Sequence, residues 1–115
     1  MTEVVLIEAT DAFTHVAVRG KLDAAGVGEV DLKLTSQTVA RHKPAIIDLA
    51  EVAFIASLGI GMLVAIAKSM QAHHVGVVIL TGASPVKHVL ELTHLGSLFP
   101  IVATRDEALG ALGVA

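Results

Sequence analysis

The fold of this chain is decided by the stretch Ala45–Leu63, which reads AIIDLAEVAFIASLGIGML. Its first part, Ala45–Leu49, is rich in β-branched residues and does not alternate with polar ones, which predicts a strand buried on both faces. A second apolar segment, Val52–Ile55, leads into a helical pattern that begins at Ser57. Strands that alternate with helices in this way predict an α/β domain with a mostly parallel sheet.

The same alternation extends toward both ends of the chain. The other predicted strands are the hairpin pair Val4–Ile7 and Thr14–Val18, then Gly76–Leu80, and an edge strand within Leu98–Val102. The predicted helices run from the N-cap Asp23 to about His42, from Ser57 to His73, from Ser84-Pro85 to Gly96, and onward from the capping box Thr104–Glu107. The fold class is therefore α/β, a single domain over residues 1–115 with a mixed sheet of about five strands, about four helices and an N-terminal β-hairpin.

Residue spacing also predicts what each helix buries. The second helix has an apolar stripe of Leu58, Met62, Leu63, Ile66 and Met70, and the third has one of Val86, Val89, Leu90 and Leu92. Gly59 and Gly61 are expected to let the second helix pack closely on the sheet. Asp48 is expected to make a structural hydrogen bond at the end of its strand.

Composition excludes several functional classes. The 115 residues contain no Cys, Trp or Tyr, so disulfides and cysteine chemistry are excluded, and a cytoplasmic protein is expected. The net charge is −3 and the eight Lys and Arg residues are scattered, which predicts no nucleic-acid partner. The longest uncharged run, Val52–Ala67, is shorter than the roughly 20 residues of a spanning helix, so we expect no membrane insertion. The N-terminus, Met1–Val4, has no basic region followed by an apolar one, so we expect no signal peptide.

No catalytic, cofactor or metal site is predicted. The six histidines lack a recognisable metal-ligand spacing, and the glycines lack the lysine of a phosphate-binding loop. A serine between a strand and a helix resembles the nucleophile elbow of α/β-hydrolases. However, Ile55 replaces the first glycine of G-x-S-x-G, and no histidine follows Asp106 to complete a triad.

Several segments, in order, resemble the STAS domain, the family of bacterial anti-sigma factor antagonists and of the cytoplasmic tails of sulfate transporters. Gly20-Lys21-Leu22-Asp23 resembles the family's G-x-L-D motif, and Ile47–Ile55 resembles its third strand. Val77–Leu95 resembles its fourth strand and third helix. The likeness covers nearly the whole chain.

The family's switch motif, F-I-D-S-[ST]-G-[LI], reads here Phe54–Ile60, FIASLGI. The serine and the glycine are kept, whereas Ala56 replaces the aspartate and Leu58 the second hydroxyl. The resemblance implies phosphorylation at Ser57; a plain helix N-cap is the alternative interpretation of this serine. Asp23 is interpreted equally as a cap or as part of the partner surface. The partner-binding residues implied by the resemblance are Asp23, Ala56, Ser57, Leu58 and Gly59.

The resemblance predicts a non-catalytic regulatory module that works by partner switching in transcription regulation and stress response. Its implied partners are an ATP-binding anti-sigma factor serine kinase, which it binds until Ser57 is phosphorylated, and a phosphatase that resets it. The alternatives are a scaffold subunit like those of the stressosome, or the cytoplasmic STAS subunit of a lipid-transport ABC system. Homo-oligomerisation stays open.

Overall fold

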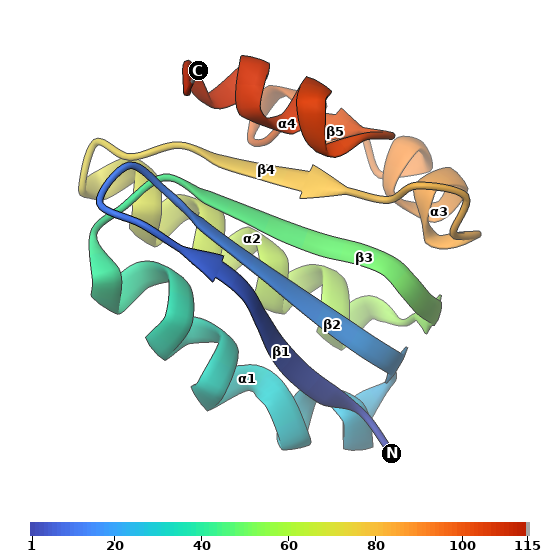
Figure 1. Cartoon of the computed structure of the whole chain (residues 1–115). Helices are drawn as coiled ribbons and strands as arrows, with labels where there is room; N and C mark the ends of the chain where they lie inside the picture. Colours follow the sequence, from blue (N-terminus) through green and yellow to red (C-terminus); the bar gives the residue numbers. More distant parts are fainter. Residues whose placement is uncertain (115) are drawn as a thin grey trace.

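The computed structural model describes residues 1–114 as one sheet of five strands with helices on both faces (Figure 1). The strands are β1 (Glu3–Ala9), β2 (Thr14–Leu22), β3 (Ala45–Ile55), β4 (Val77–Leu80) and β5 (Ile101–Val102). The helices are α1 (Ala24–Thr38), α2 (Ser57–Ala72), α3 (Val86–Leu92) and α4 (Arg105–Leu112), with short 3₁₀ turns η1 (Val39–Arg41) and η2 (Leu95–Ser97). The predicted fold class is confirmed.

The sheet has the order β1-β2-β3-β4-β5, with β1 antiparallel to β2 and every later pair parallel. This confirms the N-terminal hairpin and the edge position of the last strand. Neighbouring residues of a strand point to opposite faces, and the two central isoleucines of β3 illustrate this. Ile47 lies in the main core with side chains of α1, α2 and α3, whereas Ile46 lies in a smaller cluster under Ala108 of α4.

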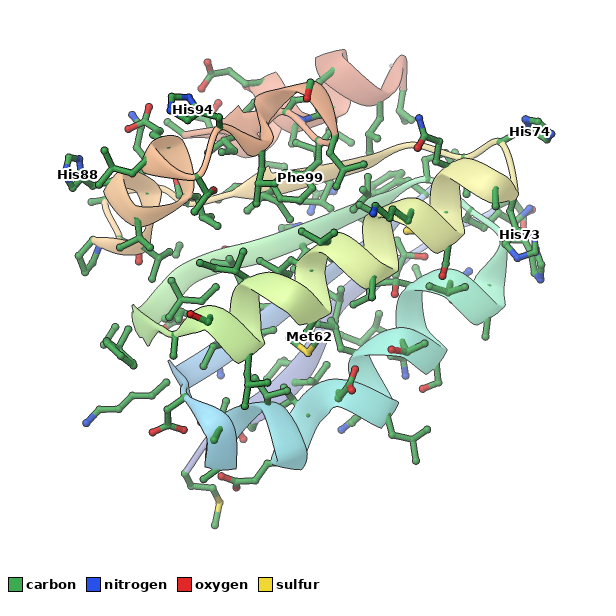
Figure 2. All side chains as sticks on the ribbon, turned by 180° about the vertical axis from the view of Figure 1, so that it is seen from behind. Met62, His73, His74, His88, His94 and Phe99 are labelled. Atoms are coloured by element: carbon green, nitrogen blue, oxygen red, sulfur yellow. The ribbon has the colours of Figure 1, made fainter. Side chains whose placement is uncertain are left out.

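The main core is filled by aliphatic side chains and by Phe99, which is fully buried. Met62 of α2 is buried on the side of the helix that faces α1, and Phe99 lies on the side toward α3 (Figure 2). Four of the five side chains in the predicted α2 stripe are buried, but Leu58 is 60% exposed. Leu58 lies in the first turn of α2 and faces solvent, so its prediction as a core residue was wrong.

The third helix differs more from its prediction. It ends at Leu92, and Gly96 lies in the following 3₁₀ turn. Val86 and Leu90 are buried, while Val89 and Leu92 are 36% and 64% exposed. A helix of two turns presents only one narrow face to the core. Val86 and Leu90 lie on that face, whereas Val89 and Leu92 lie outside it.

Strand β1 is slightly longer than predicted at both ends, and β2 and β3 are longer at their carboxyl ends. The β2 strand continues to Leu22, through the segment that carries the G-x-L-D motif. The β3 strand is continuous from Ala45 to Ile55 and includes the exposed residues Ala50 and Glu51. Both extensions occur because the two strands pair in parallel as far as Leu22 and Ile55. This pairing fixes where α1 and α2 begin relative to each other.

A polar network fastens α4 to its face of the sheet. The buried His15 ring contacts Asp48 through Nε2 at 2.9 Å and Arg105 through Nδ1 at 3.1 Å, and Arg105 also pairs with Glu8. The Asp48 carboxylate further accepts the backbone N–H of Ala50, as expected for a structural aspartate. Burial raises the pKa of Asp48, but the His15 and Ala50 hydrogen bonds and nearby positive charge outweigh it and leave that pKa below its usual value.

Candidate functional site

Two helices begin side by side at one edge of the sheet. Because β2 and β3 are parallel and Leu22 pairs with Ile55, the residues directly after them, Asp23 and Ala56, are equivalent in position. The backbone N–H of Ala56 donates to the carbonyl of Leu22 at 2.9 Å, which ties the two strand ends together. Asp23 is the N-cap of α1 and Ala56 is the N-cap of α2.

The two caps differ in chemistry. The Asp23 carboxylate accepts the backbone N–H of Gly26 at 2.8 Å, so the predicted cap at Asp23 is confirmed. Ala56 has no side-chain acceptor, and α2 therefore starts without a side-chain cap. The interpretation of Ser57 as the N-cap was wrong, because Ser57 is already the first helical residue.

Ser57 is exposed at the surface in the first turn of α2. Within residues 1–114 its hydroxyl takes part in no side-chain hydrogen bond, and no histidine lies in hydrogen-bonding contact with it. The helix N-terminus behind it carries backbone N–H groups that lack intrahelical partners, together with the positive end of the helix dipole. The arrangement suits a serine that another protein modifies better than a serine that is the catalytic nucleophile of its own active site.

The two glycines of α2 have different surroundings. A Cβ on Gly59 would lie 2.9 Å from the carbonyl oxygen of Leu22 and 2.8 Å from the Ile55 side chain. Gly59 therefore allows α2 to approach the ends of β2 and β3, as predicted. A Cβ on Gly61 would meet nothing within 4 Å, so the expectation of close packing at Gly61 was wrong.

Two large apolar side chains close to Ser57 in the sequence are exposed. Phe54, at the end of β3, is 50% exposed, and Leu58 follows Ser57 directly. The start of α3 lies beside this part of β3, since the Ser84 hydroxyl donates to the carbonyl of Val52 at 2.5 Å. The exposed side chains of α3, Val89 and Leu92, were missed as surface residues because spacing had assigned them to the core.

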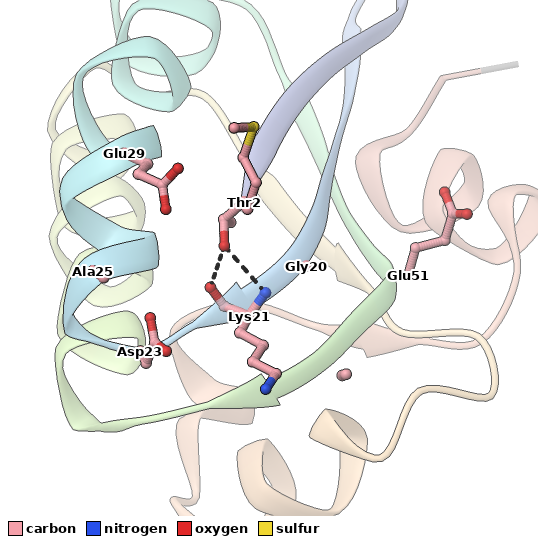
Figure 3. Close-up of a pocket in the computed structure, with 9 residues that line it drawn as sticks. Thr2, Gly20, Lys21, Asp23, Ala25, Glu29 and Glu51 are labelled. Carbon is pink, nitrogen blue, oxygen red and sulfur yellow. Dashed lines mark hydrogen bonds between the residues drawn. The ribbon is translucent and has the colours of Figure 1, made fainter.

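A pocket of about 410 Å³ lies beside the Asp23 cap (Figure 3). Its charged lining comprises Lys21, Asp23, Glu29 and Glu51. The hydroxyl of Thr2 closes one wall by bonding both the carbonyl and the N–H of Lys21, at 2.7 and 3.2 Å. Of these residues only Asp23 was predicted as a site residue, because the others come from the start of the chain, from β2 and β3, and from α1.

Comparison with known proteins identifies the fold and the family. The STAS domain model matches residues 5–108. The chain belongs to the STAS domain family. The segment Phe54–Ile60, which resembles the family's switch motif, lies where β3 ends and α2 begins, and the resemblance of the chain to the family is confirmed.

Relatives of this STAS domain carry regulatory names. A protein of Bordetella bronchiseptica, provisionally named anti-sigma factor antagonist BtrV, is 23% identical over 110 residues, which cover 95% of this chain and 94% of that protein. The crystal structure of an anti-sigma factor antagonist from Mycobacterium paratuberculosis has a TM-score of 0.85 and 25% identity, and the match covers 98% of this chain and 95% of that one. SpoIIAA in its unphosphorylated form has a TM-score of 0.68 at 18% identity, covering 94% and 96%, and shows the same fold.

Two other kinds of functional feature, a membrane-spanning helix and a metal-binding cluster, are absent from the described residues. In the part of the chain from residue 1 to residue 114, no helix has both the length and the apolar character needed to cross a membrane. No group of three or more His, Asp or Glu side chains in the same residues is placed to hold a metal ion.

Proposed function

We propose that this STAS domain is an anti-sigma factor antagonist that binds an anti-sigma factor serine kinase of the ATP-binding type and is released by phosphorylation of Ser57. The observation that carries the proposal is the exposed, unbonded hydroxyl of Ser57 at an uncapped helix start, in a segment whose Phe54 and Leu58 side chains are also exposed. The names of the relatives support the antagonist role, and a solved phosphorylated form of Bacillus SpoIIAA, 20% identical, supports a phosphate on this fold.

The surface explains how one phosphate would act as a switch. In the unmodified protein, Phe54 and Leu58 offer apolar area that a partner covers on binding. Phosphorylation of Ser57 would add about −1.5 to −2 charges at the residue directly before Leu58. Burying that charge under the partner costs more desolvation free energy than the apolar contact returns, so the complex dissociates. The domain is then a substrate and a ligand, not a catalyst.

Asp23 and Gly59 have supporting roles in this proposal. Asp23 fixes the start of α1 beside the switch and lines the acidic pocket, while Gly59 lets α2 start close to Leu22. Ala56 removes a negative charge from the position before the serine. The kinase therefore has to recognise Ser57 through Phe54, Leu58 and the backbone. We place the cycle of kinase and phosphatase in the cytoplasm.

Intact-mass spectrometry tests the proposed site. The protein is purified from the organism that encodes it and compared with Ser57→Ala and with the control Ser97→Ala, which removes another exposed serine. We expect an adduct of about 80 Da, one phosphate, that is lost only in Ser57→Ala. An adduct that survives Ser57→Ala would contradict the assignment.

Affinity for the partner tests the switch. Ser57→Asp and Ser57→Asn differ in charge but hardly in shape, so the pair isolates the electrostatic effect. We expect proteins captured from the same organism by the wild type and by Ser57→Asn to include an ATP-binding serine kinase, and Ser57→Asp to lose it. Equal capture by all three, with no adduct under any growth condition, would refute switching and favour the scaffold or transporter-subunit alternative.

A further inference from the structure

One buried histidine connects three strands of the sheet to the start of α4. His15 of β2 is 5% exposed, and both of its ring nitrogens contact a charged side chain. Nε2 lies 2.9 Å from a carboxylate oxygen of Asp48 in β3, and Nδ1 lies 3.1 Å from a guanidinium nitrogen of Arg105 in α4. The other terminal nitrogen of Arg105 pairs with Glu8 in β1. The imidazole therefore holds Arg105, and with it the first turn of α4, against the sheet.

These partners define the protonation state of the ring. A guanidinium group has N–H donors and no acceptor, so Nδ1 of His15 must accept and carries a lone pair. An ionised carboxylate only accepts, so Nε2 carries the proton and donates to Asp48. The observed contacts thus require a neutral imidazole. In a protonated imidazole both nitrogens carry a proton, and the Nδ1–H group would face the N–H groups of Arg105.

Protonation of His15 would affect its two contacts in opposite ways. Although burial raises the pKa of Asp48, its hydrogen bonds hold that pKa below the usual value, so the carboxylate stays ionised in mild acid. The Nε2–H bond to Asp48 is therefore kept when the ring becomes charged. Arg105 instead loses its acceptor and meets a like charge at hydrogen-bond distance. Glu8 does not hold Arg105 in place, because the Glu8 side chain is itself 42% exposed and can follow the guanidinium into solvent.

The other charged groups around this network do not face the ring. Asp106, beside Arg105 in α4, is exposed. The remaining ones are bound elsewhere: Arg19 to Glu51, Arg41 to the Thr14 hydroxyl, and Glu107 to Thr104 in the capping box. The charges that decide the response of His15 are therefore those of Asp48, Arg105 and Glu8.

The rest of α4 is attached to the sheet by a small apolar cluster. Ala108 is buried, and Leu109 and Leu112 are partly buried beside it. Arg105 adds a contact with Phe13, since its Cζ lies 5.4 Å from the centre of the Phe13 ring. The helix lies on the face of the sheet opposite α1 and α2 (Figure 1). Loss of the Arg105 contacts can therefore loosen α4 without opening the main core.

We propose that His15 is a pH-sensitive latch for α4: when its Nδ1 is protonated, Arg105 leaves the ring and the start of α4 detaches from the sheet. The added proton occupies the lone pair that accepts from Arg105 in the closed state. Imidazole is the side chain that changes charge near neutral pH, which makes histidine suited to such a switch. The latch is separate from partner switching, because Ser57 begins α2 on the other face of the sheet.

The first test reads the protonation of the ring nitrogens by two-dimensional ¹H–¹⁵N spectroscopy of the full, labelled chain. At about pH 8 we expect the Nε2–H tautomer of His15, and at lower pH a ring protonated at both nitrogens. The exposed His88 of α3 serves as the reference ring, and the spectrum of His15→Gln assigns the His15 signals. An Nδ1–H tautomer at about pH 8 would overturn the proposal, because Nδ1 could then not accept from Arg105.

The second test measures amide hydrogen exchange of α4 at about pH 8 and about pH 5, corrected for the intrinsic rates and compared with α2 in the same sample. We expect protection of α4 to fall at least tenfold at the lower pH in the wild type and in the control His88→Gln. In His15→Gln the amide supplies a donor and an acceptor but does not titrate, so protection should stay the same. An equal fall in His15→Gln, no fall in the wild type, or a parallel loss in α2 would overturn the latch.

Arg105→Met keeps the proposal testable if His15→Gln is less stable. Methionine retains apolar contact with Phe13 but removes the guanidinium group. We expect α4 of this variant to be less protected than in the wild type already at about pH 8, and to change less than about twofold at about pH 5. A tenfold fall in Arg105→Met would overturn the proposal, because Arg105 would then not be the released group. None of these outcomes depends on phosphorylation of Ser57.

Discussion

Ala56→Asp is expected to stabilise the domain, because it supplies the cap that α2 lacks. The backbone at Ala56, φ −103° and ψ 176°, is close to that at Asp23, φ −86° and ψ −174°, where a carboxylate already caps a helix. An aspartate at position 56 can therefore adopt the geometry seen at Asp23 and accept the N–H of Gly59.

The magnitude has two contributions. Replacing alanine by aspartate at an N-cap is worth about 1 kcal/mol. A negative charge at the helix start adds about 0.3–1 kcal/mol through the dipole. For a domain of this size, about 1.5 kcal/mol corresponds to a rise of about 6 °C in Tm. The half-buried position of Ala56 leaves the new carboxylate access to solvent.

The assay is thermal unfolding followed by far-UV circular dichroism, because the chain has no Trp or Tyr to report by fluorescence. Ala56→Asn supplies the hydrogen bond without the charge and should give about two thirds of the effect. Ala65→Asp places the same residue at an exposed site within α2 and should lower Tm slightly. If Ala56→Asp were no more stable than the wild type, or no better than Ala65→Asp, the conclusion that α2 lacks a cap would be wrong.

Three further predictions concern packing, pH and the partner surface. Gly59→Ala should lower the free energy of unfolding by at least about 1 kcal/mol through overpacking, whereas Gly61→Ala should raise it by about 0.5–1 kcal/mol. Urea unfolding followed by circular dichroism compares the two variants. Equal effects would contradict the contacts described for the two glycines. The pKa of Asp48 is lowered in the folded protein, so the ionised carboxylate stabilises the fold above pH 3.8, the unfolded value, and this contribution is lost as the pH falls through the lower folded pKa. The urea midpoint should therefore fall less steeply in acid for Asp48→Asn than for the wild type. Phe54→Ser and Leu58→Ser remove exposed side chains and should change stability by less than about 0.5 kcal/mol, yet each should weaken capture of the kinase at least tenfold; unchanged capture would remove this surface from the proposal.

Much of the fold could be predicted because its signals are local and strong. The buried β-branched runs of Ala45–Leu49 and Val77–Leu80 identified the central strands, and Asp23 and Thr104 identified two helix starts through their side-chain caps. The N-terminal hairpin was indicated by two apolar runs separated by a short polar turn. In each case the property that identifies the element in the sequence is the one that stabilises it.

The errors come from features that tertiary pairing decides. Serine is a preferred N-cap, so Ser57 was predicted as one. However, the last β2–β3 pair ends at Ile55, so Ala56 is the N-cap with an extended backbone and Ser57 is the first helical residue. Val89 and Leu92 were assigned to the core because their helical spacing suggested a wide apolar stripe, but only Val86 and Leu90 of the short helix α3 are buried. The His15–Arg105 contact joins β2 to α4, and no spacing within either segment indicates it.

If Ser57 is phosphorylated as proposed, the difference between Asp23 and Ala56 determines how the start of α2 responds to the phosphate. At Asp23 the helix start is already satisfied by a carboxylate, so an added anion nearby would meet a negative charge. At Ala56 no side chain competes for the free N–H groups of α2, and a phosphate on the next residue would be the first anion at that helix start. The modified domain would therefore hold its phosphate without losing its fold. Its partner would be displaced by the charge added at Ser57, and not by any rearrangement of the core.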